Sequence, residues 1–309
     1  MAHWFLTDAP VILTCALTGG VHGKEANPHL PEQPDEIVAQ GVAAARAGAA
    51  ILHLHAREPD GSNTMAPAIY REIHDRLCAG TDAIIQLTTG GSPTLPVAER
   101  LNTVYVAPEM CSLNMGMMDF FIRGEAIHFS NRRADILRFA TEMAARGVRP
   151  ELEVYNAVML EEVDFLLRQG ILSPPYVVNF VLHTPTQGGS RGTPENLMDM
   201  VGRLRDLPVP PGDLRVNVSS MGRTQLPITA MAMAMGLNVR VGMEDNVFYR
   251  YREPLTENAP LVARAARIAA ELDRRVATPA EARGMLALRG RAFGELPVES
   301  PAFAVPVPT

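Results

Sequence analysis

The feature that most constrains the fold of this 309-residue chain is a repeated alternation of short apolar segments with longer amphipathic segments. The short segments are rich in aliphatic and β-branched residues, as expected for strands buried in a parallel sheet. The predicted strands cover residues 11–17, 51–57, 83–88, 110–114, 151–155, 176–182, 214–218 and 238–243. The predicted helices cover residues 35–47, 67–79, 96–103, 132–146, 159–168, 193–205, 226–235 and 260–273. Strands and helices that alternate in this way predict an α/β fold, the (β/α)8 TIM barrel.

A doubly wound open sheet is the competing fold. It is disfavoured because the first predicted strand ends in Thr18-Gly19-Gly20, without the GxGxxG motif of a dinucleotide-binding sheet. We therefore expect one barrel domain over residues 1–309, with insertions and a C-terminal extension beyond the roughly 250 residues typical of this fold. Residues 278–309 are predicted to form a C-terminal arm, which is proline-rich from Pro297 to Pro308. The arm is expected to lie on the protein surface or on a neighbouring subunit.

Composition excludes several functional classes. A net charge of −6 gives no basic footprint for nucleic acid, and no apolar stretch approaches the length of a membrane span. The N-terminal residues show no signal-peptide pattern. The three cysteines, Cys15, Cys78 and Cys111, are odd in number and form no CxxC motif, which indicates a reducing compartment. We expect a cytoplasmic protein with no nucleic-acid or membrane partner.

Two histidines stand at the end of the second predicted strand, Ile51 to Arg57. Side chains two residues apart in a strand share a face, so His53 and His55 lie side by side, opposite the neighbouring leucines. The carboxyl ends of the strands build the active site of a TIM barrel. The pair is interpreted as half of a metal site, and two metal-free, hydrogen-bonded core histidines are the alternative.

The eighth predicted strand leads into Arg240-Val241-Gly242-Met243-Glu244-Asp245-Asn246. Barrel closure places this strand beside the first strand, and the first beside the second, so Glu244 can approach the histidine pair. Two histidines and a carboxylate form a catalytic zinc site or the facial triad of non-haem iron, and the absence of a partner for oxygen chemistry favours Zn²⁺. Arg240 can hold Glu244 on the same strand face, and Asp245 is a candidate general base. A surface ion pair is the alternative.

The third predicted strand ends in Thr88-Thr89-Gly90-Gly91. Hydroxyl and backbone N–H groups there could bind an oxyanion or a phosphate, although a tight turn explains the same residues. Three arginines are candidates to bind phosphate or carboxylate: Arg57, Arg191 and Arg223.

The motifs together resemble those of the β-keto acid cleavage enzymes. The segments ILHLHARxxxG, QLTTGG, SLNMG, MGRTQLP, RVGMEDN and ATPAEAR occur in that order, from the first strand to the last helix. HxH and RVGxEDN are the specific elements, whereas the TGG turn is common. The resemblance implies a zinc-dependent (β/α)8 enzyme and a homotetramer. Its members convert a β-keto acid and acetyl-CoA into acetoacetate and a new acyl-CoA.

The resemblance also implies roles for single residues. The ligands of one Zn²⁺ per subunit are His53, His55 and Glu244, and the catalytic arginine and aspartate are Arg240 and Asp245, which takes the substrate proton. Thr88 stands where the aminohexanoate-cleaving members have serine, and Ser112 where they have threonine, so both positions keep a catalytic hydroxyl. We expect the acetyl-CoA co-substrate to contact Gly90, Gly91 and Arg223.

One departure from the family pattern concerns the substrate. In the aminohexanoate-cleaving members a glutamate after the first strand contacts the substrate amine, and the matching position here is Val21, followed by His22. Without this carboxylate, an uncharged or acidic β-keto acid fits better.

Two other functions remain open. A metal-dependent hydrolase or aldolase of the same fold is one, although amidohydrolases carry HxH on the first strand with further histidines downstream. A non-enzymatic binding barrel is the other, and it leaves the clustered charges of residues 240–245 unexplained.

Overall fold

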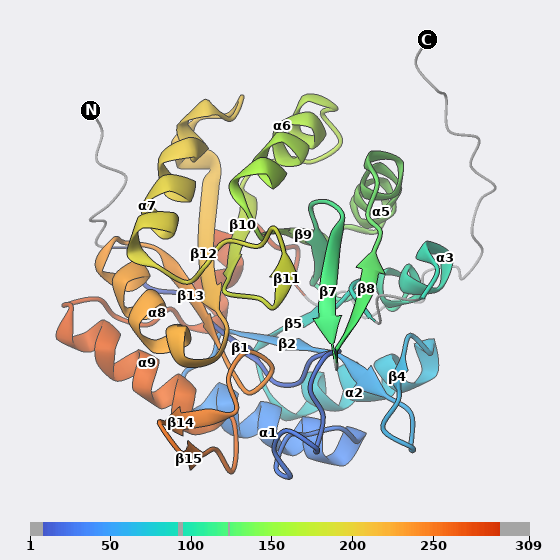
Figure 1. Cartoon of the computed structure of the whole chain (residues 1–309), viewed down its shortest axis with the longest axis vertical. Coiled ribbons are helices and arrows are strands. Elements are labelled where there is room, and N and C mark those ends of the chain that lie inside the picture. Colours follow the sequence, from blue (N-terminus) through green and yellow to red (C-terminus); the bar gives the residue numbers. More distant parts are fainter. Residues whose placement is uncertain (1–8, 92–94, 123, 291–309) are drawn as a thin grey trace.

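The structure is a computed structural model that describes residues 9–91, 95–122 and 124–290 (Figure 1). Eight parallel strands close into a barrel in the order β1-β13-β12-β10-β9-β6-β5-β2. They are β1 (Leu13–Ala16), β2 (Ile51–Leu54), β5 (Ile84–Leu87), β6 (Met110–Asn114), β9 (Arg149–Val154), β10 (Tyr176–Leu182), β12 (Leu214–Ser220) and β13 (Asn238–Val241). Each overlaps one predicted strand, and the predicted TIM barrel is confirmed.

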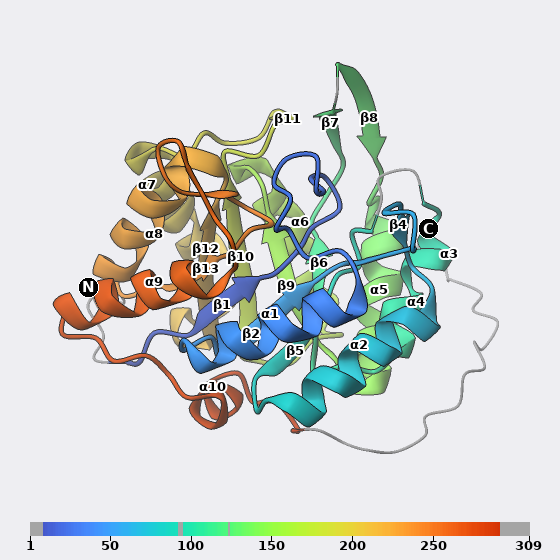
Figure 2. The ribbon, with the colours of Figure 1, turned by 90° about the horizontal axis from the view of Figure 1, so that it is seen from below.

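Helices surround the barrel (Figure 2). They are α1 (Pro34–Arg46), α2 (Pro67–Gly80), α3 (Val97–Arg100), α4 (Asn102–Tyr105), α5 (Arg133–Arg146), α6 (Leu160–Arg168), α7 (Pro194–Arg203), α8 (Gln225–Ala234) and α9 (Ala259–Glu271). Single 3-10 turns cover Ala157–Met159, Leu204–Asp206, Pro211–Asp213 and Gly222–Thr224. The one helix predicted over residues 96–103 is instead two one-turn helices, α3 and α4. No helix of the described chain is long and apolar enough to cross a membrane.

Small sheets that the sequence analysis did not predict lie in the loops after the barrel strands. A hairpin of β7 (Met118–Ile122) and β8 (Glu125–Phe129) pairs with β11 (Thr186–Gln187) into a three-stranded sheet. The others pair β3 (Ala56–Arg57) with β4 (Asn63–Thr64), and β14 (Phe248–Arg250) with β15 (Glu253–Pro254). The hairpin of β7 and β8 projects beyond the barrel (Figure 2).

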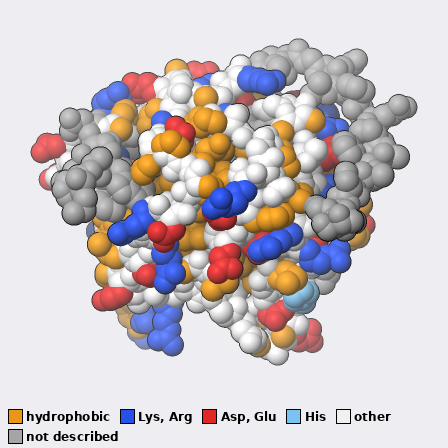
Figure 3. Space-filling view, turned by 90° about the horizontal axis from the view of Figure 1, so that it is seen from above, with side chains coloured by type: hydrophobic (Ala, Val, Ile, Leu, Met, Phe, Trp, Pro, Cys, Tyr) orange, Lys and Arg blue, Asp and Glu red, His pale blue; other side chains and the backbone are white. Residues whose placement is uncertain are grey.

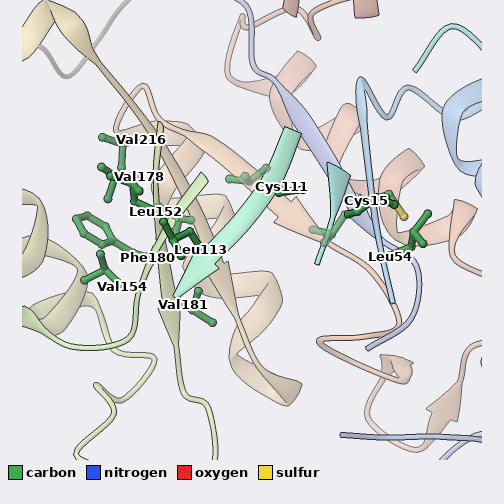
Figure 4. Packing of buried hydrophobic residues seen from close by; sticks show 14 of the residues in the cluster. Cys15, Leu54, Cys111, Leu113, Leu152, Val154, Val178, Phe180, Val181 and Val216 are labelled. Carbon is green, nitrogen blue, oxygen red and sulfur yellow. The ribbon is translucent and has the colours of Figure 1, made fainter. Parts of the chain in front are cut away.

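Two apolar clusters flank the barrel wall. The larger lies between strands and helices and includes outward-facing residues such as Val178 and Phe180 of β10 and Val216 of β12 (Figure 4). The smaller one includes Ile51 and Ile84 at the amino ends of the strands. A further helix, α10 (Pro279–Met285), contributes Ala282 to this smaller cluster, and Leu286 directly after the helix also belongs to it.

The C-terminal extension is thus partly helical. Residue Thr278 starts α10 with a capping box, because its hydroxyl accepts from Glu281 N–H and the Glu281 carboxylate accepts from Thr278 N–H. The rest of the predicted arm, residues 291–309, lies outside the described residues, so the arm stays a prediction.

The inward-facing side chains of the barrel are largely polar. His53 lies beside Gln86 in the β2–β5 register, Ser112 beside Glu151 in β6–β9, and Asn179 beside Asn217 in β10–β12. On the face seen in Figure 3, basic and acidic side chains are interspersed, with no continuous basic surface of the kind that nucleic acid binds. The polar interior of the barrel therefore positions the candidate site.

Candidate active site

A cavity of about 770 Å³ opens among the loops at the carboxyl ends of the strands. Its lining includes His53 and His55 from the end of β2, Thr88 from the end of β5, and Glu244 and Asp245 from the turn after β13. These residues are far apart in sequence and meet because parallel strands end at one rim.

The predicted metal ligands come together. His53 Nε2 lies 3.5 Å from Glu244 Oε2, and His55 Nε2 lies 3.7 Å from Glu244 Oε1. Ligand atoms around a tetrahedral Zn²⁺, each about 2.1 Å from the metal, are about 3.4 Å from one another. The separations in the structure match this spacing, and all three side chains offer a ligand atom within 4.8 Å of the others.

Two glycines, Gly242 and Gly19, determine the position of the Glu244 side chain. The eighth strand ends at Val241, two residues earlier than predicted, because Gly242 has a φ of +150°. A Cβ at Gly242 would overlap the Ala16 carbonyl, so only glycine lets the chain turn against β1 here. Glu244 N–H then donates to Ala16 O at 3.2 Å, and Gly19 leaves the space that the Glu244 side chain fills.

Both histidines are neutral in this setting. Burial lowers the pKa of His53 well below its usual value, and burial together with nearby Arg240 lowers the pKa of His55 to about 3. His53 Nδ1 lies 2.9 Å from Gln86 Oε1, which can only accept. His53 therefore carries its proton on Nδ1 and presents the lone pair of Nε2 toward Glu244.

Arg240 is the centre of a buried carboxylate cluster. Its Nε and Nη2 donate to the two oxygens of Asp245 at 3.0 and 2.7 Å, a bidentate pair. Nη2 also donates to Glu244 Oε1, and Nη1 donates to Glu153 Oε1 at 3.3 Å. One guanidinium thus holds three carboxylates at the cavity floor, and the alternative of a surface ion pair is wrong for this cluster.

The single positive charge of Arg240 does not balance the three carboxylates of the cluster. Burial, only partly offset by Arg240, raises the pKa of Glu153 to about 7 and that of Glu244 to about 8. The second oxygen of Glu244, Oε2, is buried and has no hydrogen-bond partner among the described residues. A divalent cation between the histidines and Glu244 would supply both the missing charge and the missing partner, so these residues fit a metal ion.

The other predicted site residues separate into two groups. Thr88, Gly90 and Gly91 line the cavity, and Thr88 Oγ1 accepts from Gly90 N–H at 2.8 Å. Ser112 does not line it: it is buried opposite Glu151, two residues before the cavity-lining Asn114.

The three candidate arginines also differ. Arg191 and Arg223 are exposed and line the cavity. Arg57 instead donates to the carbonyls of Gly19, His22 and Gly61, so its terminal nitrogens hold loops rather than a ligand.

Sequence reasoning gave no role to Glu153, Tyr155 or Gln86. Glu151, Glu153 and Tyr155 alternate along the buried strand β9 and its end, and such polar alternation in a buried strand was the available signal. Phe120 and Phe129 also line the cavity, from the hairpin of β7 and β8 that was not predicted.

A family model described as beta-keto acid cleavage enzyme matches residues 10–288. Among curated proteins, the 3-keto-5-aminohexanoate cleavage enzyme of Acetoanaerobium sticklandii is 38% identical over 279 residues, covering 90% of this chain and 98% of that protein. The 3,5-dioxohexanoate:acetyl-CoA acetone transferase of Paraburkholderia graminis is 37% identical, covering 93% and 98%. The 3-oxoadipate:acetyl-CoA acetyltransferase of Cupriavidus necator is 30% identical, covering 90% and 95%.

Solved structures agree on the fold. ObcA in its binary complex with oxaloacetate superposes with a TM-score of 0.73, at 20% identity, over 85% of this chain and 68% of that chain.

Proposed function

This chain belongs to the beta-keto acid cleavage enzyme family, and from that premise we propose that it condenses a β-keto acid with acetyl-CoA. The products are acetoacetate and a new acyl-CoA. The observation that carries the proposal is the triad His53, His55 and Glu244 on the cavity wall, in contact with the pair of Arg240 and Asp245. Two relatives named for acetyl-CoA support the choice of co-substrate.

The triad is proposed to hold one Zn²⁺ per subunit. Bound there, Zn²⁺ supplies Lewis-acid stabilisation for negative charge on the keto and carboxylate oxygens of the substrate. The cation would also complete the charge balance of the buried cluster around Arg240.

Asp245 is proposed to remove the proton between the two carbonyl groups of the β-keto acid. Arg240 orients it, because the bidentate contact fixes both carboxylate oxygens. The carbanion then attacks the carbonyl carbon of acetyl-CoA, a carbon–carbon bond forms, and the CoA thiolate leaves. Thr88 can stabilise the oxyanion of this step, because its oxygen accepts from Gly90 N–H and its own O–H remains available to donate.

The thiolate next attacks the original keto carbon, and the bond between that carbon and its α-carbon breaks. The new acyl-CoA departs, and the released carbanion takes back the proton from Asp245 to give acetoacetate. Ser112 does not line the cavity, and a direct role in these steps stays a prediction.

The charged groups that line the cavity indicate the substrate class. The carboxylates Glu153, Glu244 and Asp245 are all bound by Arg240, and Val21 stands at the wall where a carboxylate could bind an amine. With the proposed Zn²⁺ held by Glu244 and all three carboxylates bound by Arg240, this negative charge is already matched, so we propose a substrate with an uncharged or anionic distal group.

A substrate panel tests this function. Purified enzyme is given acetyl-CoA with an uncharged 3-oxo acid, a 3-oxo diacid or a 5-amino-3-oxo acid, and acetoacetate is measured. We expect turnover of the uncharged 3-oxo acid and the 3-oxo diacid, and a kcat/KM for the 5-amino-3-oxo acid at least tenfold below theirs. Acetoacetate from none of the three would contradict the proposal, and turnover without acetyl-CoA would favour a hydrolase.

Two further properties belong to the proposal. The homotetramer follows from the family resemblance, and light scattering after gel filtration tests it. The cytoplasmic location follows from the cysteine usage, which indicates a reducing compartment.

A further inference from the structure

We propose that Arg191 and Arg223, here called the mouth arginines, bind the phosphates of CoA at the cavity entrance. This inference rests on the proposed function, which makes acetyl-CoA the co-substrate. Its evidence is independent of the metal centre: two loops brought together at the cavity, each contributing an exposed arginine.

The two loops touch each other. β10 and β12 are parallel neighbours up to the pair Leu182 and Ser220, and Met221 N–H donates to Leu182 O at 3.0 Å. A Cβ at Gly192 would lie 2.6 Å from both Ser220 Oγ and Thr224 Oγ1, so Gly192 packs directly on the loop after β12. Arg191 directly precedes Gly192 and Arg223 directly precedes Thr224, so each mouth arginine is next to a residue of this contact.

The mouth arginines carry uncompensated positive charge. The described residues offer neither guanidinium an ion pair or a side-chain hydrogen bond. The carboxylates Glu153, Glu244 and Asp245 contact Arg240 at the cavity floor instead of pairing with a mouth arginine. In a chain of net charge −6, the entrance thus presents a local cationic site.

CoA has the chemistry to match this site. Its diphosphate and 3′-phosphate sit at one end of a long pantetheine arm that carries the thioester at the other end. Guanidinium groups bind phosphate oxygens through paired N–H donors, so two arginines at the entrance suit the phosphate end while the thioester reaches the cavity floor.

The loop of Arg223 is tied to the catalytic segment. Gly222 N–H donates to Asp245 O at 2.7 Å. Phosphates held by Arg223 are therefore in a fixed relation to the backbone of the proposed base. The length of the pantetheine chain then determines where the thioester lies in the cavity.

Kinetics with whole and truncated co-substrate test the proposal. KM is measured for acetyl-CoA and for phosphate-free S-acetylpantetheine in the Arg191→Ala and Arg223→Ala variants. We expect each variant to raise KM for acetyl-CoA by about tenfold or more, as for the loss of hydrogen bonds to a charged group. KM for S-acetylpantetheine should change by less than about twofold, because no phosphate contact is lost.

Arg250→Ala is the matched control. Arg250 is also exposed and lies on the β14–β15 hairpin at the same end of the barrel, but it does not line the cavity. Its KM for acetyl-CoA should equal that of the wild type. Acetyl-dephospho-CoA separates the two phosphate sources: if the variants no longer differ from wild type with it, the mouth arginines bind the 3′-phosphate, and otherwise they bind the diphosphate.

Three results overturn the inference without touching the proposed function. They are an unchanged KM for acetyl-CoA in both variants, an equal rise with S-acetylpantetheine, and a rise in KM for the β-keto acid alone. Failure of the proposed function is recognised separately, because wild-type enzyme would then form no acetoacetate from any acetyl donor.

Discussion

Replacing Gly19 by alanine tests whether the metal site depends on the space beside β1. A Cβ at Gly19 would overlap Glu244 Cγ and lie 2.9 Å from Glu244 Cδ. Ordinary contact begins at 3.4 Å, so the carboxylate carbon must retreat by about 0.5 Å. Metal–ligand distances tolerate about 0.2 Å, and the displaced ligand should lower Zn²⁺ affinity by roughly 10- to 100-fold.

The assay is competition for Zn²⁺ with a coloured chelator, together with thermal unfolding of the metal-free protein. Gly284→Ala is the control, because nothing lies within 4 Å of a Cβ there and the residue is inside α10. Alanine is the better helix former, so this control should keep Zn²⁺ affinity and leave Tm equal or higher. A folded Gly19→Ala protein with wild-type Zn²⁺ affinity would refute the reasoning.

Three further predictions concern the charged cluster. Glu244→Ala should lose metal and activity together, as seen by metal analysis and acetoacetate assay, and an active metal-free variant would contradict the assignment. Asp245→Asn should keep the metal but lower kcat by roughly 10²- to 10⁴-fold, and near-normal kcat would exclude Asp245 as the base. Because burial raises the pKa of Glu244 to about 8, the metal-free carboxyl is protonated below that pH and ionised above it. Zn²⁺ binding at pH 6.5 should therefore release about one proton from Glu244. Calorimetry in buffers of different ionisation enthalpy measures this release, and Zn²⁺ binding without proton release at pH 6.5 would contradict it.

Strand periodicity made much of the site predictable. His53 and His55 alternate with Leu52 and Leu54, and alternation with a period of two fixes which pair faces the barrel interior. The approach of Glu244 followed from barrel closure alone, since β13 and β2 both pair with β1.

The remaining features depend on tertiary contacts that one sequence does not reveal. Arg57 looked like a ligand for anions, yet its donors meet carbonyls of residues as distant as Gly19, 38 positions away. The turn at Gly242 arises from the backbone of β1, not from its own neighbours. The hairpin of β7 and β8 is an insertion in the loop between β6 and α5, so the repeating βα pattern carried no signal for it.

An isotope experiment tests the central claim most directly. Enzyme is incubated with unlabelled β-keto acid and acetyl-CoA carrying ¹³C at both acetyl carbons, and the products are identified by NMR. The account predicts acetoacetate labelled at C3 and C4 and an unlabelled new acyl-CoA, because the acetyl group joins the α-carbon of the keto acid. Label that remains in the CoA thioester, or unlabelled acetoacetate, would contradict acyl exchange at this site.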